Sequence, residues 1–195
     1  MEDIQPQLIL EIIATLSGIL CVYLQTKEKI MAWPFGILSV SISAFLFYQT
    51  KLYSDLLLHV VYIFLNIYGW YVWFMEGDDN TDAPIHQLKS KGIFLAIGLI
   101  LVVTTGLGYF MGTFTDADLY YFDAFTTSGS LVAQYLLAKK YLQNWIIWIV
   151  VDLIAVPVYL YKGLYFIAFL FFVYLILCIK GWLDWRRNYR IQGDN

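Results

Sequence analysis

Apolar residues run along this chain in seven stretches, each about as long as a membrane span. A transmembrane helix needs about 20 largely apolar residues, because the hydrocarbon layer is about 30 Å thick and a helix rises about 1.5 Å per residue. The stretches predict helices over residues 8–26, 33–50, 53–75, 92–113, 119–138, 145–162 and 164–183. Within lipid these segments must be helical, since every backbone polar group needs an internal partner and the alternation of barrel strands is missing.

The breaks between these stretches are short and charged or turn-like, with one exception. Residues 76–91 read EGDDNTDAPIHQLKSK and predict an exposed linker. We therefore expect an all-α integral membrane protein of seven transmembrane helices. Its predicted segments are a first three-helix repeat over 1–75, a linker and fourth helix over 76–118, and a second three-helix repeat with a tail over 119–195.

The composition agrees with a membrane protein. Apolar residues make up 61% of the chain and charged residues 14%, against about 45–50% and about 25% in water-soluble domains. The net charge of −3 excludes nucleic-acid binding by a basic surface. The 19% aromatic content predicts interfacial belts, a stacking site for a flat ligand, or both. Cys21 and Cys178 each lie in an apolar run and are interpreted as packing residues.

Lysine and arginine are distributed unevenly between the two sides of the predicted membrane. Ten cations lie beside the breaks that follow the first, third, fifth and seventh stretches, and only Lys51 and Lys162 lie on the other side. Since cytoplasmic loops carry an excess of cations, the N-terminus is predicted to lie outside and the C-terminus in the cytoplasm.

The two predicted three-helix segments are similar in sequence. A shift of 112 residues aligns 14–74 with 126–186 without a gap, and it pairs Trp33 with Trp145 and Gly69 with Gly181. Other matched pairs include Tyr23/Tyr135, Lys27/Lys139, Tyr62/Tyr174, Trp70/Trp182 and Trp73/Trp185. Each half has three spans with one span between them, so the halves are predicted to run parallel. Parallel repeats with a site at their interface are a transporter architecture; duplication in a purely structural membrane protein is the alternative.

Polar residues within the predicted spans lie on shared helix faces. The third span carries Asp55, His59, Tyr62, Asn66, Gly69 and Trp73 at alternating steps of four and three, with Trp70 beside them. The fifth carries Asp116, Tyr120, Asp123, Thr127, Ser130 and Gln134; the sixth carries Trp145, Trp148, Asp152 and Tyr159; the first carries the weaker set Glu11, Thr15, Gly18 and Gln25. Each set forms one stripe of a helix. Because ionisable groups in lipid are costly, these stripes are predicted to face an interior pathway.

Several of these residues also have a structural explanation. Trp33 and Trp145 lie near span starts and suit either an interfacial belt or ligand stacking. His59 suits a simple interhelical hydrogen bond, and Asp55 and Asp123 suit entrance residues or caps. For Asp152, well inside an apolar span, both a substrate-path role and a helix-to-helix bond stay open.

The chemistry of such a pathway favours a planar, hydroxylated solute that is neutral or carries one positive charge. Indole and phenol rings stack on flat ligands and attract cations, and carboxylates and amides accept hydrogen bonds from hydroxyl groups. No arginine lies inside a predicted span, so a phosphorylated ligand is disfavoured. The chain has no phosphate-binding loop of the G-x-x-x-x-G-K-[ST] type, which argues against intrinsic ATP coupling. Coupling to a proton or Na⁺ stays open.

At this point the sequence resembles a known family. The stretch WPFGILSVSISAFLFYQTKLYSDLLLHVVYIFLNIYGWYVW over 33–73 resembles the signature of PnuC-type vitamin transporters, as do residues 120–165 and GWLDW at 181–185. The matching elements are Leu52-Tyr53-Ser54-Asp55, Tyr68-Gly69-Trp70 with Trp73, Trp145 with Trp148, and Asp152. One departure is His59, where the family more often has glutamine.

The resemblance implies a bacterial inner-membrane carrier for nicotinamide riboside, with a SWEET-like 3+1+3 topology, usually a homotrimer. It also implies facilitated diffusion with alternating access, trapping of the cargo by a cytoplasmic kinase, and no cofactor. Substrate-binding candidates are Asp55, Tyr62, Asn66, Trp70, Trp73, Gln134, Asn144, Trp145, Trp148, Asp152 and Trp182. Thiamine, riboflavin and deoxynucleosides are alternative cargoes. A membrane enzyme is disfavoured, because His59 and His86 do not form a catalytic constellation.

Overall fold

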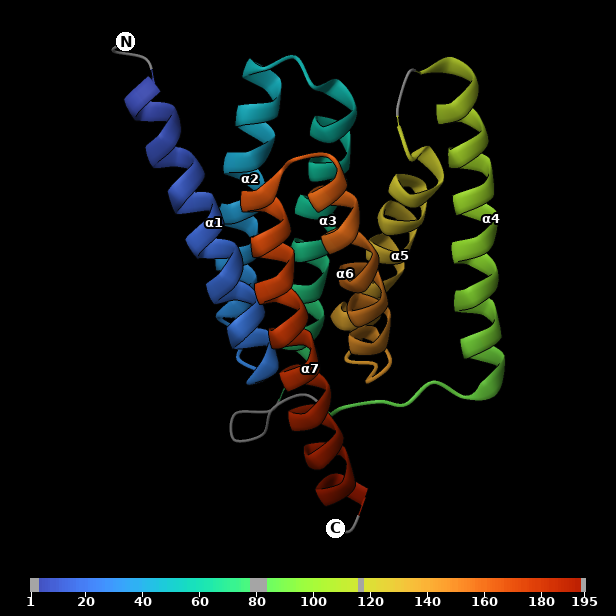
Figure 1. Ribbon diagram of the computed structural model, residues 1–195. Coiled ribbons are helices and arrows are strands. Elements are labelled where there is room, and N and C mark those ends of the chain that lie inside the picture. Colours follow the sequence, from blue (N-terminus) through green and yellow to red (C-terminus); the bar gives the residue numbers. More distant parts are fainter. Residues whose placement is uncertain (1–3, 78–83, 116–117, 194–195) are drawn as a thin grey trace. The chain divides into compact units, whose positions relative to one another are not determined.

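The computed structural model describes residues 4–77, 84–115 and 118–193, and these residues form seven helices (Figure 1). The helices are α1 (Ile4–Thr26), α2 (Ala32–Gln49), α3 (Tyr53–Glu76), α4 (Ser90–Phe114), α5 (Tyr120–Ala138), α6 (Asn144–Tyr161) and α7 (Tyr165–Gly193). All seven predicted helices are therefore confirmed.

The chain divides into two compact units, and each is described by itself. Unit 1 spans Met1–Pro84 and holds α1, α2 and α3; α2 packs against both of the others. Unit 2 spans Ile85–Asn195 and holds α4 to α7, in which each helix packs against the next in chain order. By packing, the fourth helix thus belongs with the second three-helix repeat.

Six of the seven helices are long and apolar enough to cross a membrane, within the ranges that the structure describes. The helix that falls short is α5, because Thr126, Thr127, Ser128, Ser130 and Gln134 interrupt its apolar residues. The helix α5 packs between α4 and α6, and this packing compensates for its polarity. Ten of the nineteen residues of α5 are buried, so its polar side chains meet protein rather than lipid. The sequence predicted seven spans, and the crossing by α5 stays a prediction.

The backbone repeats at the predicted spacing of 112 residues. The helix α2 begins at Ala32 and α6 at Asn144, while α3 begins at Tyr53 and α7 at Tyr165. The loop before α2 has a left-handed residue at Glu28 (φ 57°), and the loop before α6 has one at the matching Lys140 (φ 51°). The turns before α3 and α7 match in the same way, at Lys51 (φ 60°) and Gly163 (φ 74°).

In each unit two tryptophans pack together, one at the start of a helix (α2 or α6) and one on the helix that follows it (α3 or α7). In unit 1 the rings of Trp33 and Trp73 meet edge to face with centroids 5.2 Å apart, and in unit 2 Trp145 and Trp185 meet at 5.4 Å. Edge-to-face pairs at this separation are favourable. Trp33 and Trp145 are 0% and 1% exposed. The interfacial-belt interpretation of these two residues is therefore wrong, since belt residues contact headgroups.

Glycine makes room for each of these rings. A Cβ atom on Gly69 would collide with the ring of Trp33, and one on Gly181 would lie 2.7 Å from the ring of Trp145. The Gly-Trp pairing that the sequence repeat showed therefore has a packing cause: the indole of α2 or α6 lies directly on the backbone of α3 or α7.

A second ring cluster repeats near the opposite end of the same helix pairs. In unit 1 Phe47 contacts His59 (4.8 Å) and His59 contacts Tyr62 (6.0 Å). In unit 2 the equivalent rings are Tyr159, Phe171 and Tyr174, with separations of 5.1 and 6.1 Å. His59 therefore occupies the packing position that a phenylalanine fills in the other unit.

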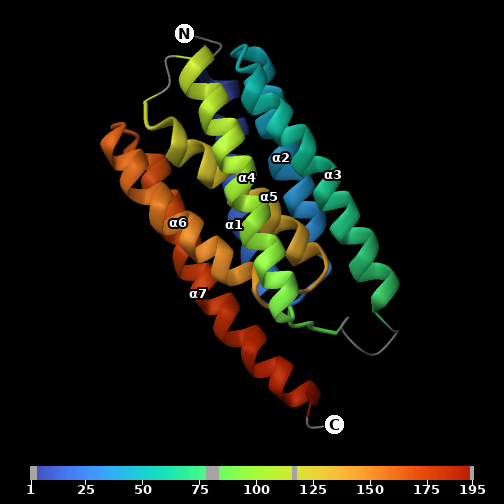
Figure 2. The ribbon, with the colours of Figure 1, turned by 90° about the vertical axis from the view of Figure 1, so that its right-hand side faces the viewer.

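The end of the predicted linker, residues 85–88, is hydrogen-bonded to the loop between α5 and α6, with Ile85 buried while His86 and Gln87 are exposed as predicted. His86 N–H donates to the carbonyl of Lys140 at 2.9 Å, and Leu142 N–H donates back to the carbonyl of His86 at 2.9 Å. Two glutamine side chains complete the attachment: Gln192 Oε1 accepts from Ile85 N–H and Gln143 Oε1 accepts from Leu88 N–H. Figure 2 shows α7 extending past the α5–α6 loop, which lets Gln192 reach this segment. We call residues 85–88 the strap.

Candidate functional site

The polar stripe of α3 in unit 1 is only partly buried. Asp55 at its start is exposed, whereas Asn66 is 4% exposed and packs against Gly36 and Cys21. Asn66 Nδ2 donates to the carbonyl of Tyr62 one turn earlier, at 2.8 Å. The amide thus satisfies its donor within its own helix and directs its oxygen toward α2.

The tryptophans of this stripe have different surroundings. Trp73 is buried against Trp33, while Trp70 is 41% exposed within the described structure. The Trp73 ring is thus enclosed by protein, whereas part of the Trp70 side chain is not. Tyr62 is half-buried in the ring cluster with His59.

His59 has a local explanation. Its Nδ1 lies 2.9 Å from the carbonyl oxygen of Asp55, one turn earlier on α3, and its ring packs against Phe47. The hydrogen bond lies within α3, so the interhelical hydrogen bond predicted for His59 is not the one observed; its contact across helices is the ring packing against Phe47 on α2.

Unit 2 gathers its predicted site residues along α6. Trp145, Trp148 and Asp152 follow at steps of three and four and so share one face of the helix. Trp145 is fully packed against Gly181 and Trp185, Trp148 is half-buried, and Asp152 is 1% exposed. Trp182 on α7 is half-buried and has the guanidinium of Arg186 over its ring at 5.8 Å.

Asp152 is the most unusual of these groups. Its Oδ2 atom is buried and has no hydrogen-bond partner among the described residues. Burying a carboxylate without partners costs several kcal/mol. An ionisable group kept inside a membrane-spanning helix at this cost is therefore a candidate for a functional site.

Other buried polar atoms lie at the beginning of α6. Asn144 is 0% exposed; its Nδ2 donates to the carbonyl of Tyr141, and its Oδ1 has no partner in the described structure. The indole N–H of Trp145, next in sequence, is likewise without a partner there. Gln134, near the end of α5, is also buried. Three predicted site residues thus place hydrogen-bonding side chains inside unit 2.

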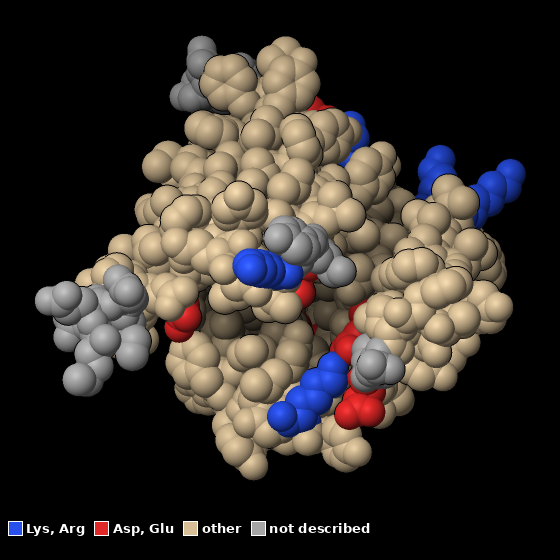
Figure 3. Space-filling model, turned by 90° about the horizontal axis from the view of Figure 1, so that it is seen from above, with Lys and Arg blue, Asp and Glu red and all other residues tan. Residues whose placement is uncertain are grey.

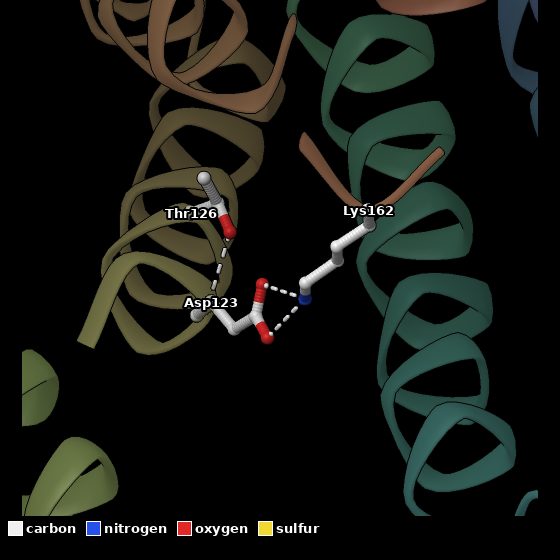
Figure 4. Close-up of polar contacts among 3 residues, drawn as sticks. All are labelled: Asp123, Thr126 and Lys162. Atoms are coloured by element: carbon white, nitrogen blue, oxygen red, sulfur yellow. Dashed lines mark hydrogen bonds and ion pairs between the residues drawn. The ribbon is translucent and has the colours of Figure 1, made fainter. Parts of the chain in front are cut away.

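An ion pair that the sequence analysis did not anticipate joins α5 to the α6–α7 turn. Lys162 Nζ lies 2.9 and 2.7 Å from the two carboxylate oxygens of Asp123 (Figure 4). Thr126 on the same helix turn donates its hydroxyl to the carbonyl of Asp123 at 3.0 Å. Asp123 is therefore neither a cap nor a free entrance carboxylate. The sequence feature that could have predicted this ion pair is that Lys162 and Asp123 both lie at span ends on the cation-poor side of the predicted membrane.

Surface charge and possible metal ligands also bear on the chemistry of the site. Charged side chains are sparse on the face seen in Figure 3, in keeping with the 14% charged composition. Among the described residues, no group of three or more His, Cys, Asp or Glu side chains is placed to hold a metal ion. Asp116, which the fifth-span stripe included, lies outside the described residues.

Helices of membrane-spanning length that bury polar atoms without partners indicate a helical membrane protein with a functional polar interior, a class that includes the transporters. Comparison with known proteins gives the family. Residues 8–187 match the family described as nicotinamide mononucleotide transporter, so the chain belongs to that family and is a transporter, not an enzyme.

Three relatives illustrate the range of the family. The chain is 26% identical to the nicotinamide riboside transporter PnuC of Escherichia coli (strain K12), covering 95% of this chain and 88% of that one. It is 25% identical to the riboflavin/roseoflavin transporter RibM of Streptomyces davaonensis, over 90% and 83% of the two chains. A crystal structure of the vitamin B3 transporter PnuC superposes with a TM-score of 0.75 at 25% identity, covering 93% of this chain and 82% of that chain.

Proposed function

We propose that this protein carries nicotinamide riboside across the bacterial inner membrane. Relatives named as nicotinamide riboside transporters match it over almost its whole length. The observation in unit 2 that supports this cargo is Asp152, a buried carboxylate with an oxygen that has no partner. Nicotinamide riboside is a cation with an aromatic ring, a carboxamide and ribose hydroxyls, and its positive charge would compensate that carboxylate.

The site residues divide by chemistry in this proposal. Ring stacking is assigned to the tryptophans Trp70, Trp73, Trp145, Trp148 and Trp182, with Tyr62 beside them. Trp70, Trp148 and Trp182 are the better candidates, because Trp73 and Trp145 are already packed. Asn66, Gln134 and Asn144 would hydrogen-bond the carboxamide or ribose. Asp152 would meet the positive charge, and Asp55 would lie at the entrance.

The transport mechanism that we propose is facilitated diffusion by alternating access. Two parallel three-helix repeats joined by α4, in a SWEET-like 3+1+3 arrangement, would rock about the cargo. The N-terminus would lie outside and the C-terminus in the cytoplasm, where a kinase would trap the nucleoside by phosphorylation. The repeated loops and ring clusters of the two units support a common origin of the repeats.

The protein is proposed to assemble as a homotrimer. In support, α4 carries apolar side chains around most of its circumference, and Gly98 and Gly106 have open space where a side chain would project. A hollow of about 320 Å³ lined by Leu101, Val102, Thr105 and Gly106 lies on the same helix. Small residues let a neighbouring helix approach closely in a membrane.

Riboflavin is the second candidate, because the relative from Streptomyces davaonensis is named for it. Riboflavin has no positive charge and would leave the Asp152 carboxylate uncompensated, which favours the cationic nucleoside. Purified protein in lipid nanodiscs would be titrated with nicotinamide riboside, thiamine, riboflavin and thymidine, and uptake would be followed in proteoliposomes. Saturable binding and uptake of nicotinamide riboside are expected; saturable binding of riboflavin alone would overturn the proposal.

A further inference from the structure

Two rows of residues form the contact between α4 and α5. On each helix the row takes every fourth residue, and rows of this kind are the ridges by which helices pack. The row on α4 consists of Gly92, Ala96, Ile100, Thr104, Gly108 and Gly112. The row on α5 consists of Tyr120, Ala124, Ser128, Val132 and Leu136. Both rows extend almost from one end of their helix to the other, so the contact can hold α4 along its length.

At the end of α4 the contact is made by tyrosine rings that lie on glycine. A Cβ atom on Gly112 would lie 2.6 Å from the ring of Tyr120, and one on Gly108 would collide with the ring of Tyr121. Because the rings lie directly on the backbone, the two helices cannot slide past each other without repacking. The start of α5 is thereby fixed against the end of α4.

In the middle of α4 a hydrogen bond joins the two helices. The hydroxyl oxygens of Thr104 and Ser128 are 2.6 Å apart. Since Ser128 also donates to the carbonyl of Phe125 at 3.1 Å, its oxygen accepts from Thr104. Ser128 is 1% exposed. A hydroxyl group in a membrane interior has no water as an alternative partner, so separating the helices here would leave polar groups unpaired.

Near the start of α4 the contact is apolar and includes further parts of unit 2. Ile100 belongs to a buried cluster with Val132 and Leu136 of α5. Side chains packed against this cluster come from the strap, the α5–α6 loop and α6, and include Leu88, Tyr141 and Ile147. The strap is also hydrogen-bonded to this loop and to the end of α7. The strap and α4 therefore share one core with the second repeat.

We propose that the strap and α4 move as one rigid body with α5, α6 and α7 during transport. The carrier then works with a three-helix body and a four-helix body, and the linking helix does not move independently of the second repeat. The boundary lies between Glu76, where α3 ends, and Ile85, where unit 2 begins. Rigid bodies keep their internal contacts while they change state, and the ring, hydroxyl and apolar contacts of α4 are all internal to unit 2. This inference rests on the proposed function, in which the carrier alternates between states.

Spin-label distances in the full chain test this inference. Cys21 and Cys178 are first replaced by alanine, and labels are then attached in pairs at Met75 on α3, Lys91 on α4 and Arg187 on α7, which are all exposed. In nanodiscs the Lys91–Arg187 distance is expected to have one narrow distribution that nicotinamide riboside leaves unchanged. The Met75–Arg187 distance is expected to be broader without cargo and to shift when cargo is added, because these labels lie on different bodies.

The two label pairs separate this inference from the proposed function. A Lys91–Arg187 distribution as broad as that of Met75–Arg187 in the cargo-free protein would overturn the inference, as would a shift of Lys91–Arg187 with cargo. A narrow Lys91–Arg187 distribution beside a broad Met75–Arg187 distribution that does not respond to nicotinamide riboside would support the four-helix body and would overturn the proposed cargo.

A cross-link between α4 and α5 tests the same inference through transport. The hydroxyl oxygens of Thr104 and Ser128 lie close enough for a disulfide to form in the double variant Thr104→Cys, Ser128→Cys. In the background without native cysteines, uptake by the oxidised variant is expected to stay within about twofold of uptake after reduction, because the cross-link lies within one body. Loss of uptake on oxidation that reduction restores would overturn the inference.

The matched control for the cross-link is the double variant Thr105→Cys, Ser128→Cys. Thr105 is exposed, and its hydroxyl donates to the carbonyl of Leu101 on its own helix. This variant is therefore expected to form no internal disulfide, and the intact mass of each oxidised protein checks this. Equal uptake by the control before and after oxidation shows that the oxidant itself does not inhibit transport.

Discussion

Unit 1 and unit 2 contain the same two ring clusters at the same register, but they differ in the polar groups that lie between them. Trp33, Gly69 and Trp73 have direct equivalents in Trp145, Gly181 and Trp185. The residues between the clusters differ: Gly36, Val40 and Asn66 in unit 1 correspond to Trp148, Asp152 and Cys178 in unit 2. The retained residues pack helices together, and the changed ones introduce the buried acid.

The difference has a chemical interpretation for a nucleoside carrier. The proposed cargo has a charged aromatic ring at one end and a hydroxylated sugar at the other, so a carrier for it needs different polar groups for the two ends. A duplicated scaffold keeps the helix packing, while a few substitutions make the repeats unequal. Trp33, Gly69 and Trp73, with their equivalents, therefore indicate packing, whereas Asp152, which has no acidic equivalent in unit 1, is the candidate for a function of unit 2 alone.

The largest effect is expected from adding a side chain at Gly181, in the tryptophan–glycine packing that both units share. Gly181→Leu places a side chain where the Trp145 ring lies, with a Cβ only 2.7 Å from that ring. Overpacking of this kind costs about 1–3 kcal/mol or more, and we expect a much lower yield of monodisperse protein and a lower Tm.

Gly69→Leu in unit 1 is expected to have a similar effect, since its Cβ meets the Trp33 ring. Ile179→Leu, on the same helix as Gly181 and with a side chain that is 45% exposed, is the control. A normal yield and Tm for Gly181→Leu would show that the contact of Trp145 with the Gly181 backbone does not hold α6 against α7.

The next largest effect is expected at Asp152, which has no acidic equivalent in unit 1. Asp152→Asn removes the charge but keeps the size, and affinity for nicotinamide riboside is expected to fall about tenfold or more, as for the loss of a charge-assisted contact. Val40→Ala, at the equivalent position of unit 1, is the control and should leave affinity within about twofold. Unchanged affinity in Asp152→Asn would remove the carboxylate from the site.

A smaller effect is expected at the ion pair of unit 2. Unit 1 has Glu11 and Thr50 at the positions of Asp123 and Lys162, and thus has no cation to form this pair. Lys162→Met is expected to lower the free energy of unfolding by about 0.2–1 kcal/mol, because the pair is partly open to solvent. Unfolding in low and high salt checks this: the difference between variant and wild type should shrink as salt rises.

The smallest effect is expected from exchanging equivalent rings. His59→Phe gives unit 1 the ring that Phe171 supplies in unit 2, so stability should change by less than in Lys162→Met and uptake should be unchanged. A large loss of uptake with normal folding would give His59 a functional role and would break the equivalence of the two clusters. Phe171→His is the reciprocal variant.

The sequence predicted the helices closely but not the contacts among their polar residues. The predicted span 53–75 corresponds to Tyr53–Glu76, and 145–162 to Asn144–Tyr161. The stripe on α6 was visible because helical periodicity places Trp145, Trp148 and Asp152 on one face. Periodicity does not identify the facing side chains on other elements, and so it did not predict the pairing of Asp123 with Lys162 or the hydrogen bonds that attach the strap to the α5–α6 loop.

The sequence by itself determined the span lengths, the repeat and its register, since lipid forces each apolar stretch into a helix and the spacing of Gly and Trp carries the pattern of packing. Only the tertiary structure decided which tryptophans are enclosed, which lysine pairs with Asp123, and that Asp152 is buried with an oxygen that has no partner among the described residues. Those partners depend on how neighbouring helices pack side chain against side chain, and residues far apart in the chain meet only when the helices are packed.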